Sequence, residues 1–323
     1  MSPRIALFAL VGLKIIGFDD HALAQPIRPE NKAVVSFSTK VLRASGNEFF
    51  YQYAASNSLS SEEPMTTFRI PVRDGELLGR QARIIGPSNK KWYFSGSNQG
   101  FVVATHANRY LNWYSENALH PGDSMNFSFC SKGLPSINLF YAESFAPPFT
   151  DSDVDSLQKA GVTSERIFPE WKENSFKGFT ISPGIPDSPF VAFSFLDTLL
   201  SYARQSAELG WLGRGRDDDC DNDEKPEEGI VRNIEQRLGK AKKLLERRDS
   251  VLARRELEKL FDKVERLWKR SQDVDKKDKR NRWEKKDKAV MTSEAYALLK
   301  YNTEYLIDRL PDRKPKKGSK DKD

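Results

Sequence analysis

The clearest hydrophobic pattern lies in the last third of the chain and has the period of amphipathic helices. Between Ile230 and Leu245, apolar side chains recur three or four residues apart with charged residues on the other faces, as on one side of a helix. A second stripe of the same kind occupies residues 252–267, and Asp249 before it is a suitable N-cap. The short connection between the stripes predicts an antiparallel pair of helices.

Two further segments predict helices that complete this module. The stretch from Ser293 to Leu310 carries apolar residues at helical spacing, and Pro311 ends it because proline cannot continue a helix. The strongly apolar stretch from Phe190 to Leu212 predicts a helix that bridges to the preceding part of the chain. Since each stripe is too narrow to be buried all round, we expect the helices to pack on one another.

Between Ala33 and Tyr141 the pattern changes to short runs that several times alternate apolar and polar side chains, as half-buried strands do. Turn signals such as Asp74-Gly75 and Pro121-Gly122 separate the runs. The runs are Ala33–Phe37, Phe49–Tyr53, Phe68–Val72, Ala82–Ile85, Phe101–Ala104, Leu111–Tyr114 and Met125–Phe129. Repeated short strands at this spacing predict a β-sandwich of immunoglobulin-like build, with a closed barrel as the alternative.

These patterns predict an α+β, multi-domain protein, in which an N-terminal immunoglobulin-like β-sandwich is followed by a C-terminal antiparallel α-helical module. After the sandwich we expect a short helix capped by Thr150 and ending before Gly161, and one strand from Phe176 to Ser182. The predicted segments are a signal peptide at 1–24, the sandwich at 30–145, an irregular extension at 146–188, the bridging helix and an acidic linker at 189–228, the helical module at 229–310 and a disordered basic tail at 311–323.

The first 24 residues predict export from the cytosol. Arg4 supplies a positive start, Ile5 to Phe18 form an apolar run, and Ala22-Leu23-Ala24 gives a small-residue cleavage site that leaves Gln25 as the first residue. The apolar run is too short to span a bilayer, which takes about 20 residues, so we expect no membrane span after cleavage. The mature protein is therefore expected to be secreted or periplasmic.

The charge of the chain is large but unevenly distributed. Charged residues make up 30% of the sequence and the formal net charge is +6, with much of the excess in the connector 269–288 and in the tail. Because acidic residues are interspersed there, nucleic acid is an unfavoured partner. One alternative function is a salt-sensitive binder of anionic polymers. Its lysines would be Lys285, Lys286, Lys314, Lys316 and Lys317.

The two cysteines, Cys130 and Cys220, predict a disulfide. An exported protein folds in an oxidising compartment, where such bonds form and persist. The bond would tie the sandwich to the linker and, by closing a loop of about 90 residues, would constrain the unfolded chain. Two thiols that never approach each other are the alternative.

An acidic run from Asp217 to Glu224 has the alternating carboxylates of a calcium loop. However, Glu224 stands where an EF-hand loop needs glycine, and Ile230 where it needs the last glutamate. We therefore interpret the run as a solvated linker and assign no metal to it. The three histidines of the chain stand in no zinc-binding motif.

Aromatic residues gather in and around the later predicted strands. Exposed rings on a sandwich face commonly hold sugars or peptides, so this cluster is the candidate ligand-binding site, and a purely structural core is the alternative. The predicted ligand-binding residues are Trp92, Tyr93, Tyr110, Trp113 and Tyr114.

No catalytic motif is recognisable in the sequence. It contains no G-x-S-x-G elbow, P-loop or G-x-G-x-x-G fingerprint, although a pair of glycosidase carboxylates has no sequence signature. The sequence favours an exported, non-catalytic binding or envelope-associated protein without a cofactor, whose partner is a glycan, a peptide or a surface. A secreted hydrolase of glycosidase or esterase type is the alternative.

Several stretches of the C-terminal half together resemble a known family. They are Phe195-Leu196-Asp197-Thr198-Leu199, Gln205-Ser206 with Gly210-Trp211, the helical repeat that begins at Gly229, and Thr292-Ser293-Glu294-Ala295-Tyr296-Ala297-Leu298-Leu299. They resemble the C-terminal region of uncharacterised exported bacterial proteins that carry a FIMAH-like helical domain, over about residues 161–310. The resemblance implies an appendage on a secreted or surface protein and no catalytic or binding residue. The pair of cysteines that often precedes the last helix in such relatives is replaced here by lysine and aspartate.

Overall fold

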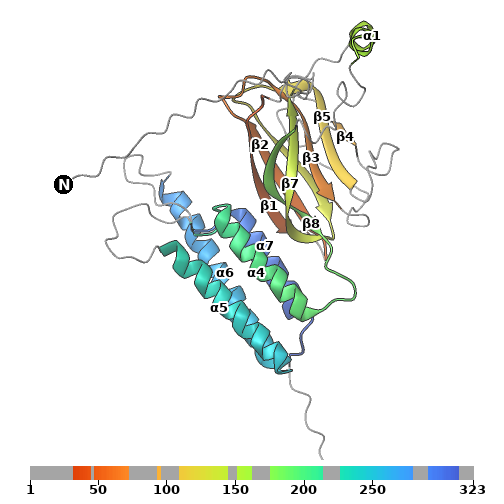
Figure 1. Ribbon diagram of the computed structural model, residues 1–323. Helices are drawn as coiled ribbons and strands as arrows, with labels where there is room; N and C mark the ends of the chain where they lie inside the picture. Colours follow the sequence, from red (N-terminus) through yellow and green to blue (C-terminus); the bar gives the residue numbers. More distant parts are fainter. Residues whose placement is uncertain are drawn as a thin grey trace, which may run out of the picture. The chain divides into compact units, whose positions relative to one another are not determined.

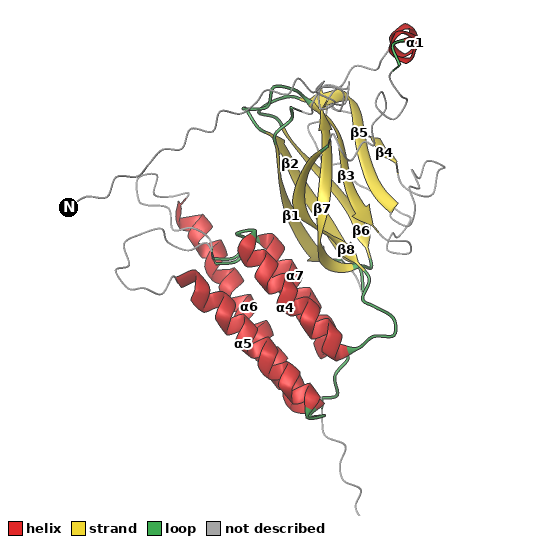
Figure 2. Ribbon diagram, in the orientation of Figure 1, coloured by secondary structure: helices red, strands yellow, loops and turns green. Residues whose placement is uncertain are grey.

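The protein has an α+β fold (Figure 1, Figure 2). The structure, a computed structural model, describes residues 32–44, 47–72, 93–95, 109–144, 151–161, 175–213, 226–278 and 290–312. Within these ranges the chain forms two antiparallel sheets and then a set of long helices, with one short helix between them. The N-terminal segment predicted to direct export lies outside the described residues.

The strands form two sheets. The first sheet has the order β1 (Val35–Arg43), β2 (Phe49–Asn57) and β6 (Ser124–Ser131). The second has the order β4 (Tyr93–Ser95), β5 (Arg109–Leu119), β3 (Met65–Val72), β7 (Leu134–Ser144) and β8 (Phe176–Gly184). Because strands next to each other in sequence often belong to different sheets, the chain passes repeatedly across the sandwich.

The core between the two sheets is built from aromatic rings, with Phe68 of β3 near its centre. The Phe68 ring lies 4.2 Å from that of Phe37, 5.3 Å from Trp113 and 5.5 Å from Phe127, measured between ring centroids. Phe37 and Phe127 belong to the first sheet, whereas Phe68 and Trp113 belong to the second. On β2 every second residue is buried, which is the alternation expected of a strand with one face in a core.

The sandwich takes its last strand from beyond residue 145, where the sequence predicts that it ends. β8 pairs along its whole length with β7, from Phe176 opposite Ala142 to Gly184 opposite Leu134. Residues 31–145 and 175–323 consequently belong to one compact unit. The chain therefore leaves the sandwich after β7 and returns to complete it.

The sequence does not predict β7, because Gly133-Leu134-Pro135 has the composition of a turn. In the structure Leu134 and Pro135 already belong to the strand. Two strands that the sequence predicts, at residues 82–85 and 101–104, lie outside the described residues. The other predicted strands between Ala33 and Tyr141 correspond to β1, β2, β3, β5 and β6.

Four helices follow β8 and form an antiparallel bundle: α4 (Ala192–Glu208), α5 (Pro226–Glu246), α6 (Ser250–Asp278) and α7 (Ser293–Ile307). Their order in space is given by salt bridges and hydrogen bonds between successive helices, Asp197 with Lys242, Lys240 with Glu256, and Glu265 with Tyr296. α7 also packs on α4 and closes the ring. This is an up-down-up-down bundle. The helix that the sequence predicts as a bridge, α4, packs beside the predicted pair α5–α6 as a member of the bundle.

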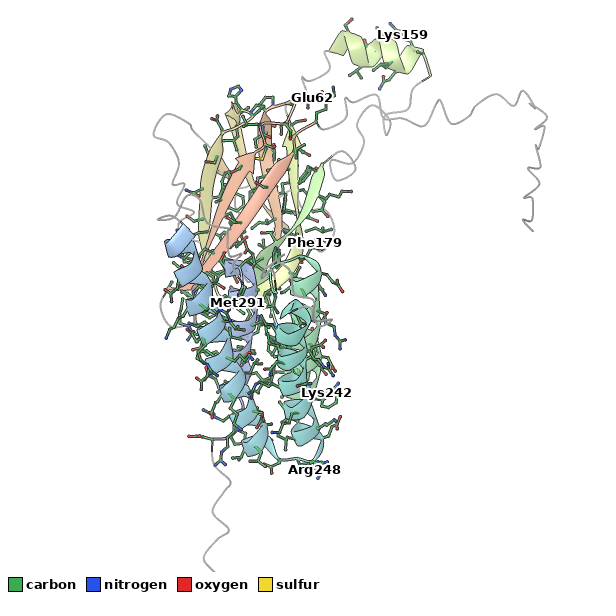
Figure 3. All side chains as sticks on the ribbon, turned by 90° about the vertical axis from the view of Figure 1, so that its left-hand side faces the viewer. Glu62, Lys159, Phe179, Lys242, Arg248 and Met291 are labelled. Carbon is green, nitrogen blue, oxygen red and sulfur yellow. The ribbon has the colours of Figure 1, made fainter. Side chains whose placement is uncertain are left out.

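The two connections at one end of the bundle are tied together by short backbone hydrogen bonds. Leu212 after α4 forms a β-bridge with Met291 before α7, and Gly213 N donates to the Val290 carbonyl at 2.9 Å. Met291 lies at the end of the bundle next to the sandwich, and Arg248, in the turn between α5 and α6, lies at the opposite end (Figure 3). In that turn Asp249 caps α6, its carboxylate accepting from Leu252 N at 3.1 Å, as the sequence predicts.

α7 is the element that joins the bundle to the sandwich, and it is buried on nearly all sides. One face packs on α4 and α6, and another on β1 and β7. The buried Glu294 accepts a hydrogen bond from the Thr39 backbone N–H at 2.5 Å, and Tyr301 donates to the Val41 carbonyl at 3.3 Å. The amide of Asn302 donates to the Pro135 carbonyl at 2.8 Å.

The short helix α1 (Asp151–Lys159) belongs to the other compact unit. It is followed by Gly161 at a φ of 81°, a left-handed conformation that glycine adopts without strain. Both the helix and its glycine end are as the sequence predicts, whereas its predicted cap, Thr150, lies outside the described residues.

Glu256 on α6 is the buried member of an ion-pair network between α5 and α6. Its side chain is 8% exposed, and its carboxylate lies 2.8 Å from Lys259 Nζ and 3.0 Å from Lys240 Nζ. The hydrogen bond from Lys259 lowers the pKa of Glu256 against the opposing effect of burial, and Lys240 lowers it further. The carboxylate is therefore a source of pH-dependent stability.

We expect Glu256→Gln to lower the free energy of unfolding at neutral pH by about 1–2 kcal/mol. Because the pKa of Glu256 is lower in the folded than in the unfolded chain, its contribution is full above about pH 4.3 and is lost as the pH falls through the folded value. Urea denaturation should thus show a deficit of the variant that shrinks below about pH 4. Glu246→Gln, at an exposed position of the same hairpin, should show neither effect. A deficit for Glu256→Gln that stays constant under acid would contradict the assignment.

Candidate functional site

The predicted aromatic site is divided by the structure. Trp92 lies outside the described residues, and only the backbone is described for Tyr93 and Tyr114, which face each other on β4 and β5. Trp113 is fully buried between the sheets and packs against Phe68, so its ring belongs to the core and not to a surface. Tyr110 is half-buried and lines a cavity.

This cavity is the candidate functional site and has a volume of about 790 Å³, within the range of small-molecule and peptide pockets. It is lined by the end of β3, the first half of β7, the connection from β8 to α4, and α4 itself. It is lined by Pro71, Val72, Tyr110, residues 134–139, Tyr141, residues 183–191, Ser194, Phe195, Thr198, Tyr202 and Asn302.

The directions of the backbone groups on β7 follow from two hydrogen bonds. Asn302 Nδ2 donates to the Pro135 carbonyl, so the backbone of Pro135 points away from β8. On β8 the Ile181 carbonyl accepts from the Tyr53 hydroxyl at 2.9 Å, so it points away from β7. Ile181 stands opposite Ile137, and two opposite residues of an antiparallel pair direct their backbone groups either both toward each other or both away. Because these directions alternate along a strand, every second residue from 135 to 141 directs its N–H and C=O away from β8.

Pro71 opens the cavity by ending the ladder between β3 and β7. The described pairs of these strands stop at Arg69 opposite Tyr141, although β3 still pairs with β5 as far as Val72. Since Tyr141 directs its backbone groups toward β3, Arg69 directs its own toward β7, and so does Pro71 two residues further on. Pro71 has no N–H to donate. Within the described residues the ladder between β3 and β7 therefore ends before Pro71, and the cavity lies beside the first half of β7.

The cavity wall is aromatic and largely uncharged. The Tyr110 and Tyr141 rings lie edge to face with centroids 6.0 Å apart, and Phe190 and Phe195 contribute two more rings at 5.5 Å from each other. Among the lining residues that the structure describes, Asp187 is the one charged side chain. Such a wall suits an uncharged ligand that presents apolar faces to the rings.

Asn302 is the most firmly fixed polar group of the wall. Its side chain is buried, with 2% of the residue exposed, and Nδ2 donates to the carbonyls of Pro135 and Leu298, each at 2.8 Å. Both amide hydrogens are consequently used inside the protein. The group that Asn302 offers the cavity is therefore its oxygen Oδ1, which accepts hydrogen bonds.

Several residues of the cavity carry no sequence signal of their own. Asn302 and Thr198 occur in segments with a helical pattern, where a polar residue is expected on the exposed face. Asp187 occurs in a stretch with the composition of a turn. Proline inside a predicted strand is the signal that points to the site, because Pro71 cannot bond to both neighbours of a central strand. In the pattern Phe68–Val72, however, Pro71 has the place of an ordinary strand residue.

The remaining predicted sites fall mostly outside the described residues. Cys130 lies half-buried on β6, where burial and the nearby carboxylate of Glu48 raise the pKa of its thiol. Its predicted partner Cys220 is not described, so the disulfide stays a prediction. The acidic run 217–224 and the lysines of the connector and tail also lie outside. In the part of the chain that is described, no cluster of acidic, histidine and cysteine side chains is arranged to hold a metal.

A second polar and aromatic cluster lies between α6 and α7. The Trp268 and Tyr296 rings stack at 4.6 Å, and Lys300 Nζ lies 2.7 Å from Glu265 Oε1. Burial disfavours the charged form of Lys300, but hydrogen bonds to Glu265 and to the Tyr296 hydroxyl outweigh it and raise its pKa. Glu265, Tyr296 and Lys300 bond to one another, so the cluster helps to fix α7 on α6.

Comparison with known proteins gives no relative from which a function could be transferred. No protein-family model matches the chain, and a search of the curated proteins finds no match to it. Among the helices of the described ranges, none combines the length and the apolar character needed to cross a membrane. The function is therefore argued from the geometry of the cavity.

Proposed function

We propose that this protein is an exported, non-catalytic binding protein that holds a glycan or a peptide in the cavity beside β7. The carrying observation is the wall of that cavity, whose described residues combine aromatic rings, neutral polar groups and one charged side chain, Asp187. A ligand is gripped there by apolar and hydrogen-bonding contact. Among the described lining residues Asp187 is the one carboxylate, whereas hydrolysis of a glycoside by the usual mechanism takes two across the bond.

Export is proposed from the sequence, since the first 24 residues have the charge, apolar run and cleavage site of a signal peptide. The mature chain then acts outside the cytosol, in the periplasm or beyond the cell. Its partner there is a cell-envelope or extracellular polymer, or a segment of another exported protein. In that compartment a Cys130–Cys220 disulfide would be stable.

We further propose that the sandwich is of immunoglobulin-like build. The first sheet contains β1, β2 and β6, and the second, with the short β4 set aside, contains β5, β3, β7 and β8. This corresponds to strands A, B and E of such a domain facing C′, C, F and G. The likeness of the bundle to FIMAH-like domains is proposed on the residue motifs named above, and the antiparallel arrangement of α4 to α7 supports it.

The proposed function predicts that filling the cavity abolishes binding without unfolding the protein. Thr198 on α4 is half-exposed and lines the cavity, so Thr198→Trp should place a large ring in it. On glycan and peptide arrays the parent protein should give hits whose affinity falls roughly tenfold or more in the variant. Glu208→Trp, at an exposed position of the same helix outside the cavity, should bind as the parent does.

Hydrolase assays on the same preparation decide between binding and catalysis. The secreted protein, beginning at Gln25, should turn over none of a panel of glycosidase and esterase substrates while retaining its array hits. Turnover that is lost on Asp187→Asn would replace the binding proposal by the hydrolase alternative. Array hits that survive Thr198→Trp unchanged would show that this cavity is not the binding site.

A further inference from the structure

We propose that the ligand of the cavity is an extended peptide segment, which pairs as an additional strand with the first half of β7 in the slot opposite Pro71. This inference rests on the proposed function and names the class of its ligand. It follows from the backbone groups that the separation of β3 from β7 leaves facing the cavity. Addition of a strand to such an edge is a general mode of peptide recognition.

Within the described residues, the unpaired edge of β7 consists of the backbone groups of Ile137 and Leu139. Both residues direct their N–H and C=O away from β8, toward the side where β3 would continue, and the described strands offer them no partner there. The edge is closed at both ends, because Tyr141 pairs with Arg69 and the Pro135 carbonyl accepts from Asn302. It therefore presents two donors and two acceptors in one row.

The spacing of these groups matches a peptide. Residues two apart on a strand are about 6.8 Å apart, and each offers one donor beside one acceptor. An extended peptide repeats the complementary pair at the same interval, so a segment of about five residues satisfies the edge. A glycan has no such repeat along its chain, and its hydroxyls would meet this row out of register. The observations therefore favour a peptide.

The side chains beside the edge indicate which residues the peptide carries. Leu139, on the edge itself, is 36% exposed. Ile185 and Val191, in the connection that lines the cavity, are 44% and 51% exposed. Exposed apolar groups beside a strand edge select apolar side chains at alternate positions of the added strand.

Pro71 keeps the slot available in the free protein. If β3 continued to pair with β7, its own backbone would occupy the groups of Ile137 and Leu139. The missing N–H of Pro71 prevents this at the first position beyond Arg69. The same residue therefore both opens the cavity and leaves the edge of β7 for another chain.

Amide hydrogen exchange of the free, full-length protein tests the edge directly. Ser136, Asn138 and Phe140 direct their backbone groups to β8, so their amides should exchange about a hundredfold more slowly than those of Ile137 and Leu139. This alternation should disappear when a peptide binds. Equal protection of all five amides without ligand would show that the slot is already filled by the protein itself, and would overturn the proposal.

Binding experiments test the mode of recognition. Heptapeptides selected from a random array should be enriched in β-branched and aromatic residues, and their binding should be blocked by Thr198→Trp. N-methylation of the peptide backbone, placed at each residue in turn, should weaken binding about tenfold at alternate positions and little at the others. Methylation effects without a two-residue period would overturn strand addition.

Pro71→Val tests the role of the proline. The variant regains an N–H directed at β7, so β3 should extend its ladder and peptide affinity should fall about tenfold, with folding retained. Pro64→Val makes the same exchange just before β3 and outside the cavity, and should bind as the parent does. Unchanged affinity in both variants would contradict the slot.

The two proposals fail in different ways. Hits on a glycan array alone, abolished by Thr198→Trp and insensitive to Pro71→Val, would overturn the peptide inference and keep the binding function. Hits on neither array, or hits that Thr198→Trp leaves unaffected, would overturn both.

Discussion

Replacing Phe68 by alanine is expected to lower the free energy of unfolding by about 3–5 kcal/mol, a large fraction of the stability of an ordinary domain. Phe68 is fully buried, and its ring contacts rings of both sheets, among them Phe37, Trp113 and Phe127. Its removal leaves a cavity that rigid aromatic neighbours cannot fill. The loss therefore includes both the buried area and the contacts around it.

Phe179→Ala is the matched control for this substitution. It removes the same side chain from the same sheet, at a position that is 48% exposed, and should cost no more than about 1 kcal/mol. Denaturant unfolding followed by tryptophan fluorescence measures both variants, since Trp113 reports on the core next to Phe68. Equal losses in the two variants would contradict the assignment of the inner and outer faces of the second sheet.

Glu294→Ala is expected to lower the free energy of unfolding by about 2–3 kcal/mol. The carboxylate is buried, with 5% of the residue exposed, and accepts the backbone N–H of Thr39. Truncation leaves that N–H without a partner in the interface between α7 and β1, where water does not replace it. The variant loses a hydrogen bond to a charged group, and the N–H that was removed from water on folding is left without a partner.

Glu304→Ala, on the same helix, separates this effect from surface electrostatics. Glu304 also reaches β1, with its Oε2 2.9 Å from Arg43 Nη2, but the two side chains are 29% and 42% exposed. A partly solvated pair of this kind contributes less than about 1 kcal/mol. Thermal unfolding at low and high salt should show a large, salt-independent loss for Glu294→Ala and a small, salt-sensitive one for Glu304→Ala. The reverse order would contradict the proposed junction.

The helices of the bundle were predictable because their signals are local. The stripes at 230–245 and 252–267 repeat at the helical period, and Asp249 caps α6 through a contact three residues away. Each of these features involves residues within one or two turns. The sequence therefore determined where α5, α7 and the first part of α6 lie and that α5 and α6 pair as neighbours. However, α6 continues to Asp278, into the charged segment that the sequence predicts as a connector.

The strands were predicted less completely, because a strand depends on partners far away in the chain. β7 starts with Leu134 and Pro135, which read as a turn, and the strand exists because β8 pairs with it from more than 30 residues away. Trp113 reads equally well as a surface ring or a core ring. Its burial follows from the first sheet, which brings Phe127 and Phe129 against it.

Alternation of apolar and polar residues, helical stripes, caps and turn residues were thus sufficient for the class of fold and for most of its elements. The cavity was decided by the tertiary structure, since it combines a proline on β3, backbone groups of β7 and an asparagine of α7. No interval along the chain relates these three. They meet because Pro71 cannot continue the ladder to β7 and because Asn302, on a helix packed against the sandwich, reaches the carbonyl of Pro135.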